Sequence, residues 1–196
     1  MISFTRPAPA IPVPARAAAF SDESLIKRIA DCDKLAMQAL YARHHVRVFR
    51  FVLRLVHDES MAEDLISEVF LDVWRHADRF EGRSAVPTWL MSIARFKALS
   101  ARRRRTDAEL DDKIVATIAD PADDPAVTLE KKNQSELLRH ALTKLSAEHR
   151  EIIDLVYYHE QSVDEAAQVL GIPAATVKTR MFYARKKLAE WLKAAE

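Results

Sequence analysis

The sequence predicts an all-α protein of two small helical domains joined by a flexible acidic linker, with a helix-turn-helix at its C-terminal end. Three observations support this fold class. Apolar residues recur at helical spacing along most of the 196 residues. Only two glycines occur, Gly82 and Gly171. Runs that alternate apolar and polar residues between turns, as half-buried strands require, are missing.

Composition and proline content set the expected domain boundaries. Almost half of the residues are apolar, which is enough for a real core, and the net charge is only +1. The first 20 residues are rich in proline and alanine, whereas acids and two prolines crowd the stretch that follows a basic block of arginines. We therefore expect a disordered tail at 1–20, an N-terminal domain at 21–105, a linker at 106–133 and a C-terminal domain at 134–196.

The cysteine count and the N-terminal stretch indicate where the protein works. Cys32 is the single cysteine, which excludes an internal disulfide and a multi-cysteine zinc site and fits a reducing compartment. The tail shows neither an apolar signal core nor a membrane-spanning run. The expectation is a cytoplasmic protein with no membrane insertion.

Caps and apolar repeats predict the first helices of the N-terminal domain in order. Ser21 or Asp22 can cap a first helix, and a second cap near Asp33 restarts the helical pattern. A polar break follows at 57–60. Apolar residues then recur in an uninterrupted three-four repeat over 62–74, which predicts a core helix.

The other face of this core helix is acidic and carries one exposed leucine. Its residues are Glu63, Asp64, Ser67, Glu68, Leu71 and Asp72. Acids around an apolar side chain suit a protein partner better than DNA. The alternative is an ordinary solvated acidic surface.

A charged loop with an aromatic residue precedes a basic helix. The loop spans 78–84 and includes Phe80, and Pro87 opens the helix. Three residues of this helix share a face: Trp89, Ile93 and Phe96. Its cations are Arg95, Lys97 and the run Arg102, Arg103, Arg104 and Arg105. Rings that stack on bases beside cations that bind phosphates predict a single-strand site, although Phe80 and Trp89 could instead belong to the core.

The C-terminal domain ends in the sequence pattern of a helix-turn-helix. Before it, Ser146 is expected to cap a helix whose apolar residues are Ile152, Ile153, Val156 and Tyr157. Ser162 and Glu165 form a capping box that starts a short helix, and Gly171 supplies the left-handed conformation that ends it. Pro173 then presets the first turn of a second helix.

The second helix has two distinct faces. The residues expected to face inward are Val177, Met181, Ala184 and Leu188. The residues left to project outward are Thr176, Lys178, Thr179, Arg180, Tyr183 and Lys187. In this motif, the second helix normally enters the DNA major groove. The alternative is a basic surface helix with no partner.

No catalytic constellation has the spacing that its mechanism requires. His159 and Glu160 begin like a zincin motif, but Val163 stands where the second histidine ligand must lie. Glycine-rich phosphate loops, nucleophile elbows and Cys/His clusters are missing as well. We therefore predict no catalytic residue, no metal site and no cofactor.

Taken together, these features resemble the extracytoplasmic-function (ECF) type of bacterial RNA polymerase sigma factor, in the sigma-70 family. The similarity covers roughly residues 21–192. Its strongest passages are AEDLISEVFLDVWR at 62–75, PTWLMSIAR at 87–95, and AAQVLGIPAATVKTRMFYARKKL at 166–188. The chain departs from the family pattern at Ser67, Phe96 and Tyr183, where glutamine, asparagine and arginine are usual.

The resemblance implies partners and residue roles. Asp64, Glu68 and Asp72, beside Leu71, would dock on the clamp of the polymerase core. The loop at 78–84 and the following helix would capture and melt the near promoter element, with Phe80, Trp89, Arg95, Lys97, Arg102 and Arg103. The last helix would read the upstream element with Lys178, Thr179, Arg180 and Arg185, together with Thr176 and Tyr183. An anti-sigma factor is the further partner implied.

The function predicted is therefore a stress- or signal-responsive transcription initiation factor and not an enzyme. The alternative is a helix-turn-helix regulator that binds duplex DNA as a dimer. A nucleic-acid-processing enzyme is disfavoured because the catalytic groups are missing. A regulator should bind its operator unaided, whereas a sigma factor should need core polymerase and should direct run-off transcription.

Overall fold

The computed structural model describes residues 20–108, 137–138 and 140–193, and these residues form helices without any strand. The N-terminal helices are α1 (Asp22–Ala30), α2 (Lys34–Val56), α3 (Glu59–His76), a 3-10 turn (Ala77–Arg79) and α4 (Val86–Ala108). The C-terminal ones are α6 (Ala147–Ile153), a π-helical turn (Asp154–Tyr158), α7 (Val163–Leu170) and α8 (Ala174–Lys193). The all-α prediction is confirmed. The predicted tail up to residue 19 and the predicted linker from residue 109 onward lie outside the described residues.

Side-chain caps explain where the N-terminal helices begin. Ser21, Asp33 and Asp58 precede α1, α2 and α3, and each accepts hydrogen bonds from backbone N–H groups of the first turn. Such caps contribute about 1 kcal/mol each. His57 ends α2 in the left-handed conformation, with φ of 57°. The cap at Ser21, the cap at Asp33 and the polar break after α2 therefore lie where the sequence places them.

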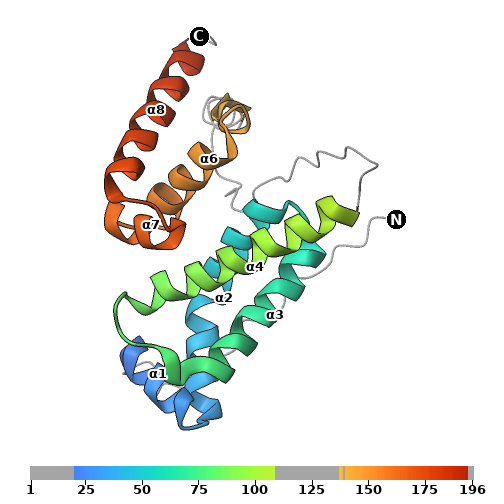
Figure 1. The fold of residues 1–196 in the computed structure, drawn as a ribbon, viewed down its shortest axis with the longest axis vertical. Coiled ribbons are helices and arrows are strands. Elements are labelled where there is room, and N and C mark those ends of the chain that lie inside the picture. Colours follow the sequence, from blue (N-terminus) through green and yellow to red (C-terminus); the bar gives the residue numbers. More distant parts are fainter. Residues whose placement is uncertain (1–19, 109–136, 139, 194–196) are drawn as a thin grey trace, which may run out of the picture.

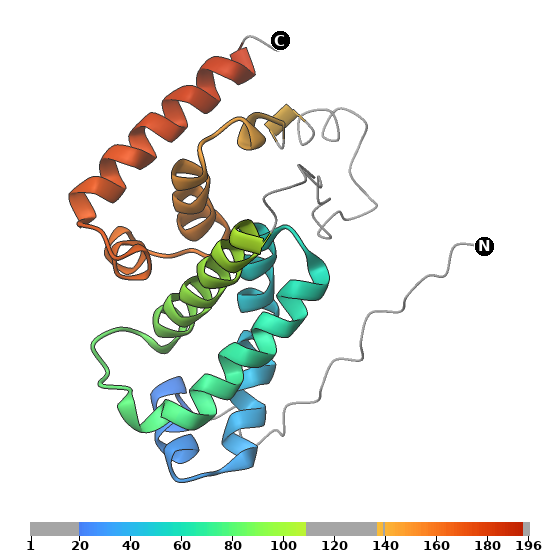
Figure 2. The same cartoon turned by 45° about the vertical axis from the view of Figure 1, so that its right-hand side comes forward.

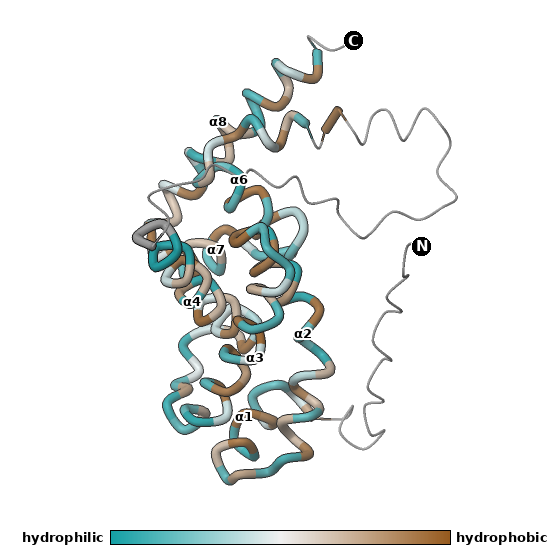
Figure 3. Tube along the Cα trace, turned by 90° about the vertical axis from the view of Figure 1, so that its right-hand side faces the viewer, coloured by the Kyte–Doolittle hydropathy of each residue, from teal (hydrophilic) through white to brown (hydrophobic). Residues whose placement is uncertain are grey.

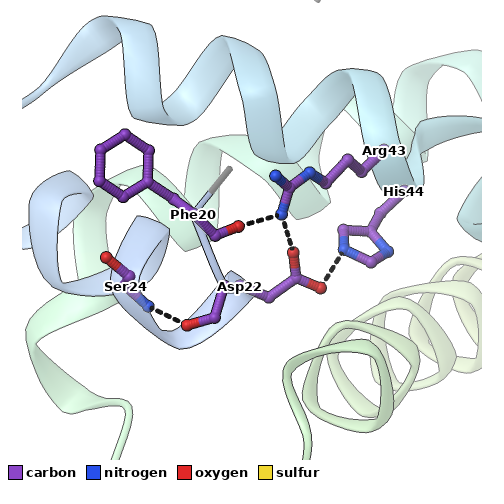
Figure 4. Close-up of polar contacts among 6 residues, drawn as sticks. Phe20, Asp22, Ser24, Arg43 and His44 are labelled. Atoms are coloured by element: carbon purple, nitrogen blue, oxygen red, sulfur yellow. Dashed lines mark hydrogen bonds and ion pairs between the residues drawn. The ribbon is translucent and has the colours of Figure 1, made fainter. Parts of the chain in front are cut away.

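Asp22 fixes α1 to the middle of α2 (Figure 4). Its carboxylate lies 2.7 Å from the guanidinium of Arg43 and 2.7 Å from Nε2 of His44. The Arg43 guanidinium also donates to the carbonyl of Phe20, at 2.8 Å. The hydrogen bond to His44 does most to lower the pKa of Asp22. Partial burial opposes this shift and Arg43 adds to it.

We expect Asp22→Asn to destabilise the N-terminal domain at neutral pH by about 1.5–3 kcal/mol, the usual range for a hydrogen bond to a charged group. Because the folded pKa lies below the usual value of about 3.9, the ionised carboxylate stabilises the fold above that value. This stabilisation is lost as pH falls through the folded pKa. Urea unfolding between pH 7 and 3 should therefore show the two proteins converging in acid. A constant difference across that range would contradict this assignment.

α2, α3 and α4 lie side by side and enclose the main core (Figure 1). Phe51 of α2, Val69 of α3 and Leu90 of α4 are fully buried there. Hydrophobic and hydrophilic residues alternate along the helices in Figure 3, as expected for helices that bury one side. The three-four repeat of α3 is the clearest example, since its buried residues are Ala62, Leu65, Ile66, Val69, Phe70 and Val73.

The C-terminal domain extends this core instead of standing apart from it. Six of its apolar side chains belong to the same buried cluster as α2 and α4: Ile152, Leu155, Ala166, Val169, Leu170 and Val177. α7 packs against α4, and α8 projects away from the N-terminal domain (Figure 2). A smaller cluster of Leu145, Ile153 and Ala184 lies within the C-terminal domain. The sequence did not predict this packing of one domain against the other.

The π-helical turn corrects one expectation about the C-terminal domain. A regular helix through this stretch would place Tyr157 on the inward face with Ile152 and Ile153. Instead the turn widens after Ile153, which changes the direction in which the following side chains project. Leu155 is fully buried, whereas Tyr157 is 53% exposed.

Candidate nucleic-acid interface

The helix-turn-helix forms as its local signals predict. The backbone N–H of Ser162 donates to the Glu165 carboxylate at 2.9 Å, and the N–H of Glu165 donates to the Ser162 hydroxyl at 3.2 Å. The Ser162 hydroxyl also donates to this carboxylate, at 2.7 Å. The backbone N–H of Ser162 first and its hydroxyl second lower the pKa of Glu165, despite some burial. Gly171 ends α7 with φ of +66°, a conformation that strains any residue with a Cβ atom. α8 follows directly after Pro173.

α8 presents the basic face that its pattern predicts. Val177 and Ala184 are fully buried. Of the six predicted DNA contacts in this helix, four are exposed and two are half-buried. The exposed four are Lys178, Thr179, Tyr183 and Arg185, and the half-buried two are Thr176 and Arg180.

Two features of α8 do not follow from its sequence pattern. The guanidinium of Arg180 lies 3.0 Å from the carboxylate of Glu148 in α6, so an acid of the same domain occupies this predicted DNA contact. Phe182 is 57% exposed, and its ring lies edge-to-face with Tyr183 at 5.5 Å between centroids. A step of 100° per residue places Phe182 near the outward face, which is the signal that could have identified it.

Arg95 and Lys97, two of the predicted DNA contacts in α4, are paired with acids. Arg95 forms a two-point ion pair with Glu151 of α6. The Lys97 ammonium lies 2.8 Å from Asp72 and 3.3 Å from Glu68, both in α3. Burial alone would lower the pKa of Lys97, but its hydrogen bonds to Asp72 and Glu68 outweigh burial and raise it. The lysine is therefore charged in the folded protein. Arg102 and Arg103 are exposed further along the helix.

The acidic face of α3 lies where its repeat predicts. Asp64, Glu68 and Leu71 are exposed, and Asp72 is half-buried. Leu71 keeps 45% of its surface accessible. Lys97, a predicted DNA contact, forms ion pairs with Glu68 and Asp72, which are two predicted polymerase contacts.

The aromatic residues near the loop divide into two environments. Phe80 and Trp89 are half-buried, lie 5.0 Å apart between ring centroids and pack against the main core. Both rings therefore pack against the core, which is the alternative to base stacking that the sequence left open. Phe96 does not share that environment, because it is 73% exposed on α4.

The interface between the domains also contains polar contacts that the sequence motifs did not predict. Thr88 is fully buried, and its hydroxyl lies 3.1 Å from the amide oxygen of Gln161 and 3.3 Å from a carboxylate oxygen of Glu165. A threonine in the first turn of a helix gives no sequence signal for such a role. These contacts connect α4 directly to the start of the helix-turn-helix.

A second set of interface contacts involves α2 and the π-helical turn. Arg54 of α2 pairs with the buried Asp154, and its guanidinium stacks on the Tyr158 ring at 4.0 Å. Arg47 donates to the backbone carbonyl of His159, whose ring packs edge-on against Phe51 at 5.5 Å. Asp154 interrupts an otherwise apolar stretch, and that interruption is the sequence signal for a buried acid with a partner.

These features define a two-domain, all-helical DNA-binding protein whose second domain is a helix-turn-helix. Two family descriptions match it: "Sigma-70 region 2" over residues 40–107 and "Sigma-70, region 4" over residues 135–188. The ECF RNA polymerase sigma factor SigL of Mycobacterium tuberculosis is 35% identical over 158 residues, which span 78% of this chain and 86% of that relative. SigK of Mycobacterium bovis is 28% identical over 177 residues, which span 87% and 92%.

Solved structures show the same arrangement of helices. CnrH, solved in complex with the cytosolic domain of CnrY, aligns with a TM-score of 0.65 at 25% identity and covers 89% of this chain and 99% of that one. RpoE of Bartonella quintana, solved with the anti-sigma factor NepR, gives a TM-score of 0.62 at 29% identity, with 76% and 92% covered.

The chain belongs to the ECF RNA polymerase sigma factors of the sigma-70 family. It is accordingly a promoter-specific transcription initiation factor. Among the described helices, none has the length and apolar character needed to cross a membrane.

Proposed function

We propose that three surfaces of this sigma factor have separate roles in transcription initiation. The acidic face of α3 binds the polymerase core through Asp64, Glu68, Leu71 and Asp72. α4 and the preceding loop hold the melted near element through Arg95, Lys97, Arg102 and Arg103, with Phe80 and Trp89 supporting them. α8 reads the upstream element through Thr176, Lys178, Thr179, Arg180, Tyr183 and Arg185. The observation that carries the proposal is the register of α8, which buries Val177 and Ala184 and leaves the basic side exposed.

Several ion pairs of the free protein must then exchange for DNA contacts. Arg95, Lys97 and Arg180 are each held by a carboxylate in the described structure. Exposed ion pairs contribute at most about 1 kcal/mol, so an exposed partner such as Glu148 gives way readily to a phosphate or a guanine. In the free protein, these carboxylates occupy the positions that DNA groups take in the complex.

Run-off transcription with purified core polymerase tests this function. Promoters selected on the holoenzyme should yield run-off transcripts, and the sigma factor alone should bind them weakly. Tight binding of an operator by the chain alone, with no transcript from the holoenzyme, would favour the dimeric regulator.

The proposed partners extend to an inhibitor. Two similar structures contain a bound partner: CnrH is bound to the cytosolic domain of CnrY, and the sigma factor RpoE is bound to the anti-sigma factor NepR. We expect an anti-sigma factor for this chain as well, which would make its activity responsive to a signal. The proposal requires no covalent chemistry from the chain itself, and it places the protein in the cytoplasm, where polymerase and promoters are found.

The α3 surface can be tested by charge reversal. We expect Glu68→Lys combined with Leu71→Ala to weaken binding to core polymerase about tenfold or more while the domain stays folded, because both side chains are exposed. Competition with the wild-type protein for core polymerase measures the change. Glu59→Lys, a matched reversal in the first turn of the same helix, should have little effect. If the double variant and the Glu59→Lys control both bind core polymerase as tightly as wild type does, this face is not the docking site.

The recognition helix allows a comparison of two cations. Arg180→Ala should cost about 1–3 kcal/mol and relax preference at one promoter position, because arginine can bind guanine with two hydrogen bonds. Lys178→Ala should weaken binding to all sequences equally and reduce the salt slope by about one. Binding of selected and single-base-changed promoters by holoenzyme distinguishes the two.

Glu148→Gln is the control for the Arg180 experiment. It releases Arg180 from its ion pair without touching α8, so promoter affinity should be unchanged or higher. If Arg180→Ala leaves base preference intact while Glu148→Gln lowers affinity, Arg180 has a structural role and α8 reads DNA in another register.

A further inference from the structure

One aromatic side chain of α4 remains without a role. Phe96 is 73% exposed, more than any other large apolar side chain in the described part of the chain. The two aromatic residues that the sequence suggested for base stacking, Phe80 and Trp89, contact each other and the core. Phe96 is therefore the ring that the basic helix presents to solvent.

The surroundings of Phe96 combine cations with hydroxyl groups. Phe96 lines a cavity of about 310 Å³ together with Ser92, Arg95 and Arg103 of α4, and the end of α7 forms the opposite wall. Arg103 is exposed two turns further along the same side of the helix. An exposed ring between guanidinium groups is the combination by which proteins hold single-stranded nucleic acid, since the ring stacks on a base and the cations bind its phosphates.

We propose that Phe96 stacks on an unpaired base of the promoter strand that α4 captures, an inference that rests on the proposed function. The ring and both arginines belong to α4, and Arg95 must leave the Glu151 carboxylate of α6 before it can bind a phosphate. A ring face accepts every base, so Phe96 adds to the stability of open DNA without strong base preference. Its exposure in the free protein is explained because the partner base becomes available only after the strands separate.

The test uses holoenzyme and a promoter with a premelted bubble. Phe96→Ala should weaken binding to the bubble about 5- to 150-fold, the range expected for one stacked base. Phe96→Trp should restore binding, and Phe96→Leu should not. The thermal unfolding temperature should not change, because the side chain is exposed. Leu35→Ala, which truncates another exposed apolar side chain in the first turn of α2, is the matched control and should bind as wild type does.

Abasic sites identify the contact. When each bubble position in turn lacks its base, one position should remove the difference between wild type and Phe96→Ala. Equal binding of the two proteins to the intact bubble would overturn the inference, and so would a loss that is the same at every position. A loss of affinity for core polymerase would assign Phe96 to a protein contact instead. If wild-type holoenzyme yields no run-off transcript, the proposed function fails first and this inference fails with it.

Discussion

Ala184→Glu is expected to abolish recognition of the upstream element by unfolding the C-terminal domain. Ala184 of α8 is fully buried in the small cluster that it forms with Leu145 and Ile153. An ionised carboxylate there would have no partner, and the destabilisation should reach about 3 kcal/mol or more. Thermal unfolding and hydrogen exchange of α8 measure this loss, and promoter binding by holoenzyme measures its consequence.

Ala189→Glu is the matched control, because Ala189 is exposed on the same helix. The added charge should leave the unfolding temperature almost unchanged. If the two variants unfold at the same temperature, α8 does not pack with Ala184 inward. Arg180→Ala should also keep the wild-type unfolding temperature, which separates a lost DNA contact from a lost fold.

Arg54→Ala is expected to destabilise the contact between the two domains by about 2–4 kcal/mol. Removal of one partner from a buried ion pair leaves the other charge uncompensated, and Asp154 is only 7% exposed. The domains should then separate more often. The single native thiol, Cys32, is exposed, so a label there and a second at Ala189→Cys report the distance between the domains.

The double variant Arg54→Met with Asp154→Leu tests whether the uncompensated charge of Asp154 causes the loss of stability. Apolar side chains of similar size often replace a buried ion pair without loss, so the double variant should return to within about 1 kcal/mol of wild type. An Arg54→Ala protein with unchanged label distance and unfolding temperature would show that this pair does not hold the domains together.

The features that the sequence predicted well are those decided by neighbouring residues. The capping box at Ser162 and Glu165, the left-handed Gly171 and the inward positions Val177 and Ala184 all depend on contacts within a few residues. The same holds for the repeat of α3 and for its exposed Leu71. Local chemistry suffices in these places because caps and helical periodicity act over one or two turns.

The features that the sequence could not predict depend on residues far apart in the chain. Thr88 and Gln161 are 73 positions apart, and Arg54 and Asp154 are 100 positions apart. No periodicity links such pairs. The same limit applies to the predicted site, because an apolar pattern cannot tell that Trp89 packs inward with Phe80 while Phe96 faces solvent. It also could not show that acids hold Arg95 and Lys97.

The core shared by the two domains has a consequence for binding equilibria. A partner that needs the domains apart binds only the open fraction of molecules, so its apparent dissociation constant is the intrinsic constant divided by that fraction. While the open fraction is small, each loss of about 1.4 kcal/mol at the interface raises it tenfold. Arg54 and Asp154 contact neither of the proposed DNA-reading surfaces, yet their substitution should tighten the binding of such a partner without any new contact. The affinity for such a partner is therefore adjustable from residues that lie between the two domains.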